Sequence, residues 1–456
     1  MLGKLGFLSV LLVASSAITI NSVPDHRYFR HSDYSGQAVV RCESALASEV
    51  ARLEEQGSVD VWGHHADGTI DVRVLSSSSS LSSCTPLVND LEEVVREWES
   101  TAFAARANAS WFEEFHTYDE LVGWYKQAAQ DHSDVMSFVP SIGKSVEGRD
   151  MPAVHITGTK SGTKSQVYFQ CQIHAREWIS SAVCNFIVNH LITNYGKDQA
   201  VTDLLDRTRL SVLVFTNPDG YEYTWKGDRM WRKNRRKDVI CHGVDLNRNF
   251  ADHWNQGGSS GNPCSDTYHG KSAASEPETQ AAMAFFQSLA PVVGGIDWHS
   301  YSELILRPLG YSSDTPPHEQ HLKAAGDGMR DAGAKVHGVN YTSIPSVGLL
   351  ATIPSFSHCP SAIQHPVLLL IGSLVPRPTR TRAFRPTVSQ SSCVTPEDMV
   401  LSCLLTKSSP MERKWSPPPC STSTTSSPTS SRLARVRKHP TSLCSFLVKK
   451  PYGTLR

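Results

Sequence analysis

The sequence has no excess of charge of either sign, since 44 Lys and Arg balance 44 Asp and Glu among 456 residues, and it has no long basic run. This balance argues against nucleic acid as the main partner. Glycine, at 29 residues, is too scarce for a collagen-like chain, and the apolar content of 39% excludes a wholly disordered one. The length predicts about two to three domains with a large core.

Beyond its N-terminus the sequence also lacks any apolar stretch long enough to span a bilayer, which takes about 20 residues. The N-terminal apolar stretch, residues 5–13, lies between Lys4 and a group of small residues ending at Ala17. This pattern predicts a secretory signal peptide over residues 1–17 rather than a membrane anchor. The eleven cysteines fit the same oxidising, extracellular destination, although an odd number leaves at least one unpaired.

Residues 21–106 have the pattern of a small α+β unit. Residues 57–62 and 69–74 alternate apolar and polar side chains, as two half-buried strands do, and residues 87–98 repeat apolar side chains at helical spacing. The unit closes at a basic residue, Arg106.

Residues 117–352 alternate between strand and helix patterns. A capping box at residues 117–120 opens a helix towards residue 130. Further along, strands are expected at residues 166–173, 210–216 and 292–298. Helices are expected at residues 179–195 and 276–289. The alternation predicts an α/β fold with a sheet flanked by helices and with functional residues at the strand ends.

From about residue 353 the pattern changes abruptly. Residues 416–431 are Ser, Pro or Thr at every position except Cys420. This composition predicts a disordered tail over residues 353–456, which should not extend a packed sheet.

Potential metal ligands follow two of the predicted strands. His174 and Glu177, three residues apart, leave the strand at 166–173, and His299 comes where the strand at 292–298 ends. Zinc is bound by imidazole nitrogen and carboxylate oxygen, and a catalytic zinc site has three protein ligands. Taken singly, each residue has a simpler interpretation: the His/Glu pair is a surface pair, and His299 is a core histidine.

Five motifs in order make the metal site the better interpretation. They are His-Ala-Arg-Glu-Trp-Ile at 174–179, Asn-Pro-Asp-Gly-Tyr at 217–221, Met-Trp-Arg-Lys at 230–233, Gly-Val-Asp-Leu-Asn-Arg-Asn at 243–249 and His-Ser-Tyr-Ser at 299–302. With them, the chain resembles the secreted zinc carboxypeptidases of the carboxypeptidase A/B family. The resemblance implies a mixed twisted sheet flanked by helices (residues 107–352), preceded by a ferredoxin-like activation prosegment (residues 21–106). It also implies a secreted zymogen, activated by a protease near Arg106, that removes the C-terminal residue of peptides and proteins as a monomer without a membrane partner.

The resemblance assigns roles to single residues. One Zn²⁺ would be held by His174, Glu177 and His299. Arg248, with Asn247, would bind the free terminal carboxylate, which a planar guanidinium grips bidentately. Arg232 would stabilise the oxyanion, and Arg176 and Tyr301 would line more distant subsites. Cys241 and Cys264 would form a disulfide.

Two functional residues of the family are missing. The family carries a general-base glutamate in a Glu-Leu-Arg-Asp run on a late strand, and a mobile tyrosine about two dozen residues earlier. Here the similarity stops after Leu350, near the place of that tyrosine, and the catalytic domain is incomplete. The residues that would set the side-chain preference fall in the same altered stretch, so aliphatic, aromatic and basic preferences all stay open.

A shifted reading frame would explain the break. Between Thr387 and Met411, codons read one base out of frame permit Tyr-Ser-Phe-Thr-Val-Glu-Leu-Arg-Asp-Thr-Gly, and the missing glutamate falls at the junction of Ser391 and Ser392. We therefore hypothesise that the residues after about 353 are an out-of-frame reading of a carboxypeptidase gene. For the chain as printed, the alternative to an active enzyme is an inactive zinc-containing module that binds peptide C-termini.

Overall fold

The computed structural model describes residues 32–75, 81–106, 110–289, 291–346 and 368–371. The chain divides into two units, Met1–Lys407 and Ser408–Arg456, and the second lies entirely outside the described residues. The predicted signal peptide and almost all of the predicted tail also lie outside them. Among the described residues, no helix combines the length and apolar content that crossing a bilayer requires.

The N-terminal part of the chain forms a four-stranded antiparallel sheet. Its elements are β1 (Ala38–Cys42), α1 (Ala47–Glu55), β2 (Val59–His64), β3 (Ile70–Val74), β4 (Thr85–Val88) and α2 (Leu91–Arg106). The strand order is β2-β3-β1-β4, and a disulfide joins Cys42 to Cys84. The two strands predicted from alternation are β2 and β3, which pair with each other. The order of elements departs from the ferredoxin-like βαββαβ pattern, because α2 follows β4 instead of preceding it.

The larger part of the chain is built on an eight-stranded mixed sheet. Its strands are β5 (Met136–Val139), β6 (Ala153–Thr157), β7 (Ser165–Gln170), β8 (Thr208–Leu213), β9 (Val292–Trp298), β10 (Leu304–Arg307), β11 (Thr342–Pro345) and β12 (Leu368–Ile371). They lie in the order β11-β10-β12-β9-β7-β8-β6-β5. The central strands β12, β9, β7 and β8 run parallel, so their carboxyl ends meet at one edge.

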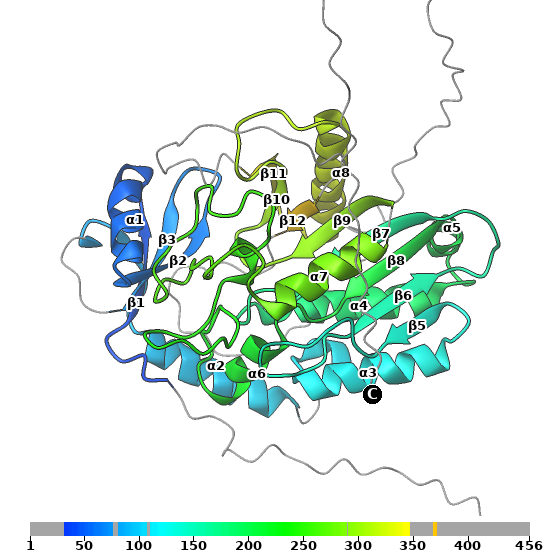
Figure 1. Ribbon diagram of the computed structural model, residues 1–456, viewed down its shortest axis with the longest axis horizontal. Coiled ribbons are helices and arrows are strands. Elements are labelled where there is room, and N and C mark those ends of the chain that lie inside the picture. The colour runs from blue at the N-terminus through cyan, green and yellow to red at the C-terminus, as the bar shows by residue number, and fades with distance from the viewer. Residues whose placement is uncertain (1–31, 76–80, 107–109, 290, 347–367, 372–456) are drawn as a thin grey trace, which may run out of the picture. The chain divides into compact units, whose positions relative to one another are not determined.

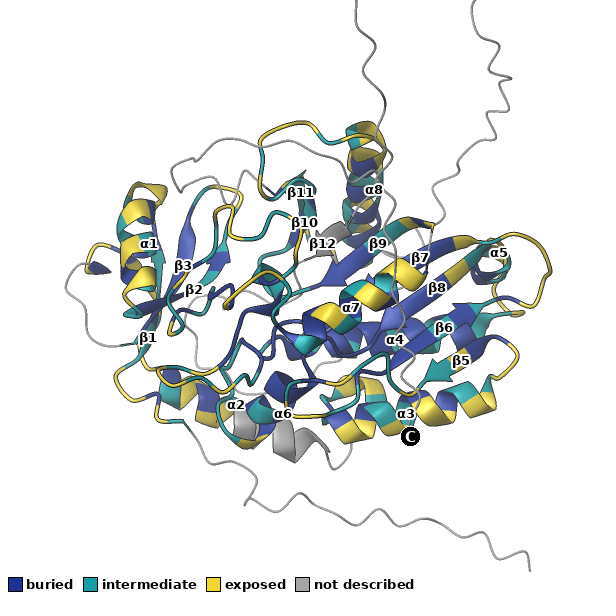
Figure 2. Ribbon diagram, viewed as in Figure 1, coloured by how far each residue is buried: buried dark blue, intermediate teal, exposed yellow. Residues whose placement is uncertain are grey.

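Helices cover both faces of this sheet (Figure 1). They are α3 (Tyr118–Asp131), α4 (Trp178–Asn194), α5 (Gln199–Arg207), α6 (Pro218–Lys226), α7 (Pro277–Ser288) and α8 (Glu319–His337), with a 3-10 turn η5 at Leu246–Arg248. One core cluster joins α3, α4, α5 and α6 to the sheet, and a second joins α7 to residues of β6, β7 and β9. Figure 2 shows the result: the sheet strands are mostly buried, whereas α3 and α7 expose their outer faces.

Local chemistry explains several boundaries. Helix α3 begins with the expected capping box, in which Thr117 and Glu120 satisfy each other's backbone N–H groups. Helix α4 is apolar around most of its circumference because it is enclosed by the core. The helix predicted at residues 87–98 begins later than expected: Leu87 and Val88 belong to strand β4, and Asp90 caps α2 by accepting bonds from the N–H groups of Glu92 and Glu93.

One expectation about the tail is wrong. Residues Leu368–Ile371, inside the stretch predicted not to enter a sheet, form β12 between β9 and β10. Ile371 is in register with Trp298, at the end of the strand that leads to His299. An apolar run of four residues is enough to fill a slot in a buried parallel sheet, whatever the composition around it.

Candidate metal centre

The site lies where two neighbouring parallel strands end. Strands β7 and β9 pair so that Gln170 faces Asp297. The chain then continues from β7 through a short loop into α4, and from β9 directly into His299. The loop carries His174, and Glu177 is the residue immediately before α4. The strand pairing therefore brings together residues that are more than 120 positions apart in the sequence.

The three predicted ligands converge, and their ligand atoms all lie within 4.8 Å of one another. Nδ1 of His174 lies 3.0 Å from Nδ1 of His299 and 2.7 Å from Oε1 of Glu177. Oε2 of Glu177 lies 3.0 Å from Nδ1 of His299. A tetrahedral zinc ion bound at about 2.0–2.2 Å separates its donors by about 3.4 Å. The donors contact one another directly, at separations about 0.4–0.7 Å shorter than this, so they must move apart slightly to hold the ion. The donor types, their convergence and their burial fit a zinc site with three protein ligands.

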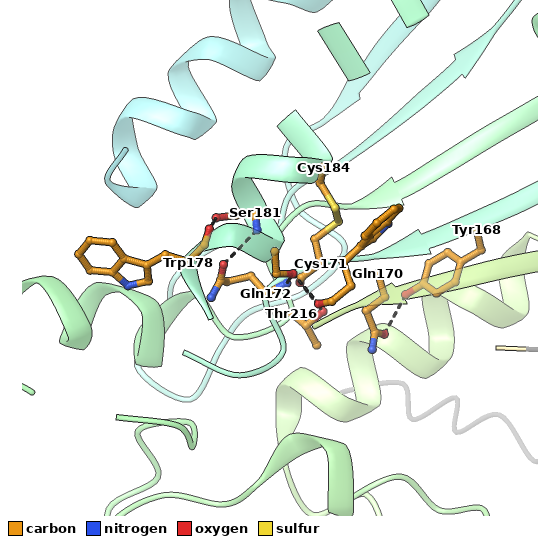
Figure 3. Close-up of a disulfide and its surroundings, with 10 residues drawn as sticks. Tyr168, Gln170, Cys171, Gln172, Trp178, Ser181, Cys184 and Thr216 are labelled. Atoms are coloured by element: carbon orange, nitrogen blue, oxygen red, sulfur yellow. Dashed lines mark hydrogen bonds between the residues drawn. A yellow bond between two sulfur atoms is a disulfide. The ribbon is translucent and has the colours of Figure 1, made fainter. Parts of the chain in front are cut away.

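Carboxylates orient both imidazoles from behind. Oδ1 of Asp245 lies 3.3 Å from Nε2 of His174, and Oδ2 of Asp297 lies 3.0 Å from Nε2 of His299. Asp297 is itself held by the side-chain amide of Gln170, which also accepts a hydrogen bond from the hydroxyl of Tyr168; Figure 3 shows the latter contact. Such partners fix the tautomer and direction of a metal-binding histidine.

The local electrostatics favour positive charge between these groups. Burial acts to raise the pKa of Glu177, but the charges of His174 and His299 outweigh it and hold that pKa well below its usual range. Burial acts to lower the pKa of His299, but Asp297 and Glu177 prevail and raise it to about 10. The pocket therefore stabilises a cation.

Arg232, predicted to stabilise the oxyanion, and Arg248, predicted to bind the terminal carboxylate, lie close to this group. Nη2 of Arg232 donates to Oδ2 of Asp245 at 2.9 Å, and its Nη1 lies 3.8 Å from Oε1 of Glu177. Arg248 follows in η5, where its Nε donates to the carbonyl of Gly258 at 2.6 Å. The backbone N–H of Asn247 donates to Oδ1 of Asp245. Asp245 thus connects His174, Arg232 and the Asn247–Arg248 turn.

The other two predicted substrate residues face the N-terminal sheet. The hydroxyl of Tyr301 donates to Oδ2 of Asp71 on β3 at 3.0 Å. Asp71 is almost fully buried. Its carboxylate also accepts hydrogen bonds from Nε and Nη2 of Arg41, at 2.6 and 2.8 Å. Arg176 pairs with Asp266 at 2.9 Å, and its guanidinium lies 5.8 Å from the ring centre of Trp62 on β2.

The disulfides were predicted only in part. Cys241 and Cys264 pair as expected, across the segment that carries Asn247 and Arg248. The bond between Cys171 and Cys184, which ties the loop that carries His174 to α4 (Figure 3), and the bond between Cys42 and Cys84 were not predicted. Eleven cysteines permit too many pairings for sequence alone to select these two.

Sequence reasoning also missed Asp245 and Gln172. Asp245 stands in the motif at 243–249, so the motif could have indicated it. Gln172 is wholly buried in the metal-binding loop, and no feature of the sequence distinguishes it from other glutamines.

The strand beside β9 carries no carboxylate that could serve as a general base. This strand is β12, with the sequence Leu-Leu-Leu-Ile. The sequence has no Asp or Glu between Asp331 and Glu397. Among the described residues, His174, Glu177 and His299 make up the group identified as able to hold a metal ion.

Comparisons with known proteins agree with this geometry. The family described as zinc carboxypeptidase matches residues 121–353, just over half of the chain. A metallocarboxypeptidase A-like protein of Trichophyton verrucosum is 32% identical over 69% of this chain and 79% of its own length. Human carboxypeptidase B2 is 36% identical over 54% of this chain and 60% of its own length. The crystal structure of a carboxypeptidase A from Helicoverpa armigera is 25% identical, covers 82% of this chain and 96% of that chain, and has a TM-score of 0.67.

A mixed sheet with a His-Glu-His group where its parallel strands end defines an α/β protein with a candidate metal centre. The chain belongs to the zinc carboxypeptidase family, and by this resemblance it is a zinc metallocarboxypeptidase; enzymes of this class act on peptide C-termini.

Proposed function

We propose that the chain is the zymogen of a secreted, monomeric zinc metallocarboxypeptidase that binds one zinc ion and removes the C-terminal residue of peptides and proteins. The observation that carries this proposal is the convergence of His174, Glu177 and His299 beside Arg232 and Arg248. When bound, zinc supplies Lewis-acid chemistry, because it polarises a carbonyl oxygen and makes water more acidic.

The chain's own residues bind and orient the substrate. The Arg248 guanidinium donates hydrogen bonds to the carbonyls of Gly258 and Asn247. Among the described residues its Nη2 has no hydrogen-bond partner. This nitrogen can therefore pair with a terminal carboxylate. Only a residue with a free carboxylate meets this requirement, which restricts cleavage to the end of the chain. Arg232, oriented by Asp245, lies where it can donate to the oxygen that gains charge as the peptide carbonyl is attacked.

We further propose that residues 21–106 are an activation prosegment that covers the substrate cleft. Asp71 engages Tyr301, and Trp62 lies against Arg176. At the end of α1, the carboxylate of Glu55 accepts a hydrogen bond from Ser260, and its carbonyl accepts one from Asn262. Helix α2 ends at Arg106, the proposed site for an activating protease. Cleavage there would break the covalent link between the N-terminal sheet and the part of the chain that carries the zinc site.

The second candidate is an inactive module that holds zinc and peptide C-termini. It is favoured by the apolar β12 beside β9, where no side chain can accept a proton from the attacking water. Loss of a general base typically costs about 10²–10⁴-fold in rate. The two candidates share the zinc site and the arginine clamp and differ only in turnover.

One set of measurements tests both candidates. The purified full chain is analysed for zinc content, cleaved near Arg106, and given a reporter peptide with a free C-terminus or the same peptide amidated. Stoichiometric zinc with chelator-sensitive release of the last residue from the free peptide supports the enzyme. Zinc with selective binding of the free peptide but no release supports the inactive module. Absence of stoichiometric zinc, or unchanged zinc uptake by His174→Ala, would refute the metal site itself.

A further inference from the structure

The two arms of the metal site are held together behind the ligands. One arm is the loop and first turn of α4, with His174 and Glu177, and the other is the end of β9, with His299. Strands β7 and β9 pair only as far as Gln170 and Asp297, and the pairing ends before either arm reaches its ligands. The position of one arm against the other must therefore depend on contacts beyond the strands.

Ser180 makes such a contact. It lies in the first turn of α4, three residues after Glu177, and its side chain is almost fully buried. Its Oγ donates to the carbonyl of Trp298 at 2.6 Å and accepts from the backbone N–H of Gln172 at 2.9 Å. Trp298 is the residue immediately before His299, and Gln172 opens the loop that carries His174. One hydroxyl thus joins the backbones of both arms.

Several hydrogen bonds tie the loop arm together, so the contact at Ser180 can transmit position to the ligands. The Gln172 amide donates to the carbonyls of His174 and Ala175 at 2.8 and 3.1 Å, and its oxygen accepts from the N–H of Ser181 at 3.2 Å. Figure 3 shows Gln172 directed to Ser181 beside the Cys171–Cys184 disulfide. Gln172 itself has a φ of 56°, a left-handed conformation that costs a non-glycine residue energy and persists only where neighbours enforce it.

We propose that Ser180 is a positioning residue that sets the distance between His299 and the His174–Glu177 pair, and so sets the affinity for zinc. A hydroxyl that donates to one arm and accepts from the other fixes their separation, because its two bonds have lengths and directions that tolerate little change. Binding sites need their donors within about 0.5 Å of the productive geometry. This inference rests on the proposed zinc site and adds the residue that tunes it.

The neighbouring serine provides a matched control. Ser181 is equally buried in the same turn of α4, but its Oγ donates to the carbonyl of Trp178 within its own helix. Ser180→Ala and Ser181→Ala therefore remove the same atom from adjacent positions, and only the first removes a link to β9.

The test measures zinc affinity by competition with a chromogenic chelator, using the purified full chain and both variants. We expect Ser180→Ala to weaken zinc binding about 10–100-fold, the effect typical of groups that orient metal ligands, and Ser181→Ala to change it by less than about threefold. The visible spectrum of the cobalt-loaded protein should change for Ser180→Ala alone. Ser180→Thr, which keeps the hydroxyl, should retain most of the affinity.

Other results would overturn either this inference or the proposed function on which it rests. Wild-type affinity in Ser180→Ala, or equal losses in both alanine variants, would show that Ser180 has no positioning role. Absence of zinc from the wild-type protein would instead refute the proposed function. If Ser180→Ala does not fold, Ser180→Cys keeps most of the volume with a much weaker donor. That variant should also lose affinity, and wild-type affinity in it would refute the inference.

Discussion

Arg248 shows how the site prepares a single side chain for its task. Two carbonyls, those of Gly258 and Asn247, hold its guanidinium. Burial lowers the pKa of Arg248, and the charge of Asp245 partly offsets this lowering. Among the described residues, Nη2 of this half-buried guanidinium has no hydrogen-bond partner, so a carboxylate that enters the proposed site would gain a charge-assisted pair in a partly dry environment.

Replacement of this arginine should weaken recognition of the chain end. We expect Arg248→Gln, after cleavage near Arg106, to bind a peptide with a free C-terminus about 10–100-fold more weakly, because each charge-assisted hydrogen bond contributes about 1.5–3 kcal/mol. Binding of the amidated peptide should be unchanged. The measurement is a calorimetric titration with both peptides.

Arg209→Gln is the matched control for this prediction, since Arg209 is exposed at the start of β8 and remote from η5 in the sequence. It should bind both peptides as the wild type does. Equal affinity of Arg248→Gln and the wild type for the free peptide would contradict the carboxylate role.

The convergence of the three proposed ligands could be predicted from sequence, but the residues that support them could not. His174, Glu177 and His299 follow buried strands, and side chains at the carboxyl ends of neighbouring parallel strands must meet. Ser180 and Gln172 act through contacts with backbone carbonyls and N–H groups. Which group they contact depends on the path of the loop, and a residue pattern does not encode that path.

At the level of elements, prediction succeeded where a local signal was strong. The capping box of α3, the long apolar α4 and the strand β9 were expected close to their observed bounds. Prediction failed where tertiary pairing decided the outcome. Strand β12 has four apolar residues in an irregular stretch, and only the free slot between β9 and β10 makes it a strand. Strand β4 was mistaken for helix because Leu87 and Val88 continue the apolar spacing of α2.

The two disulfides of the large domain allow a test of what each element does. Cys171–Cys184 spans 13 residues around the metal ligands, and Cys241–Cys264 spans 23 residues around Asn247 and Arg248. Replacing either pair by alanine should lower the free energy of unfolding by about 3 kcal/mol, because loops of this size have similar closure entropies. Denaturant midpoints of the zinc-free proteins measure this loss.

The two double variants should differ in what they bind. Without Cys171–Cys184, the loop arm loses its link to α4, so zinc affinity should fall. Without Cys241–Cys264, zinc affinity should stay close to that of the wild type, and binding of a peptide carboxylate should fall instead. Equal zinc affinities in the two variants would show that the first disulfide only adds stability.

At the level of the whole chain, the contact between the N-terminal sheet and the cleft buries acidic groups. Burial, with the nearby charge of Asp266, raises the pKa of Glu54 on α1 to about 7 and that of Asp60 on β2 to about 6. The charges of Arg248 and Arg232 act to lower the pKa of Glu54. Those of Arg73 and Arg176 act to lower the pKa of Asp60. Burial opposes ionisation of both carboxyl groups in this contact.

The docking of the proposed prosegment should therefore weaken as the pH rises. A carboxyl group whose folded pKa is raised stabilises the contact fully below its ordinary pKa of about 4.5, and this contribution is lost as the pH rises through about 7. We expect Glu54→Gln, a neutral mimic of the protonated acid, to be cleaved near Arg106 at the wild-type rate at pH 5 and more slowly than the wild type at pH 8. Comparison at each pH cancels the pH dependence of the protease.

Glu49→Gln serves as the control, because Glu49 lies on the same helix and pairs with Arg52 at its surface. It should follow the wild type at both pH values. A constant ratio of cleavage rates between Glu54→Gln and the wild type would show that Glu54 does not control docking.

The sheet itself makes the reading-frame hypothesis testable on the protein. Beside β9 the sheet holds Leu368–Ile371, which includes no acidic residue, and the nearest acidic residues in the sequence are Asp331 and Glu397. The chain as printed therefore keeps the proposed zinc ligands and Arg248 but has no base on this strand. We expect its turnover to lie at least about 10²–10⁴-fold below that of a chain continued in the shifted frame, which carries the glutamate. Sequencing the transcript across codons 345–415 should show a retained insertion or a frame difference. A continuous reading frame as printed, together with full turnover, would contradict the hypothesis and would require a proton acceptor from elsewhere in the chain.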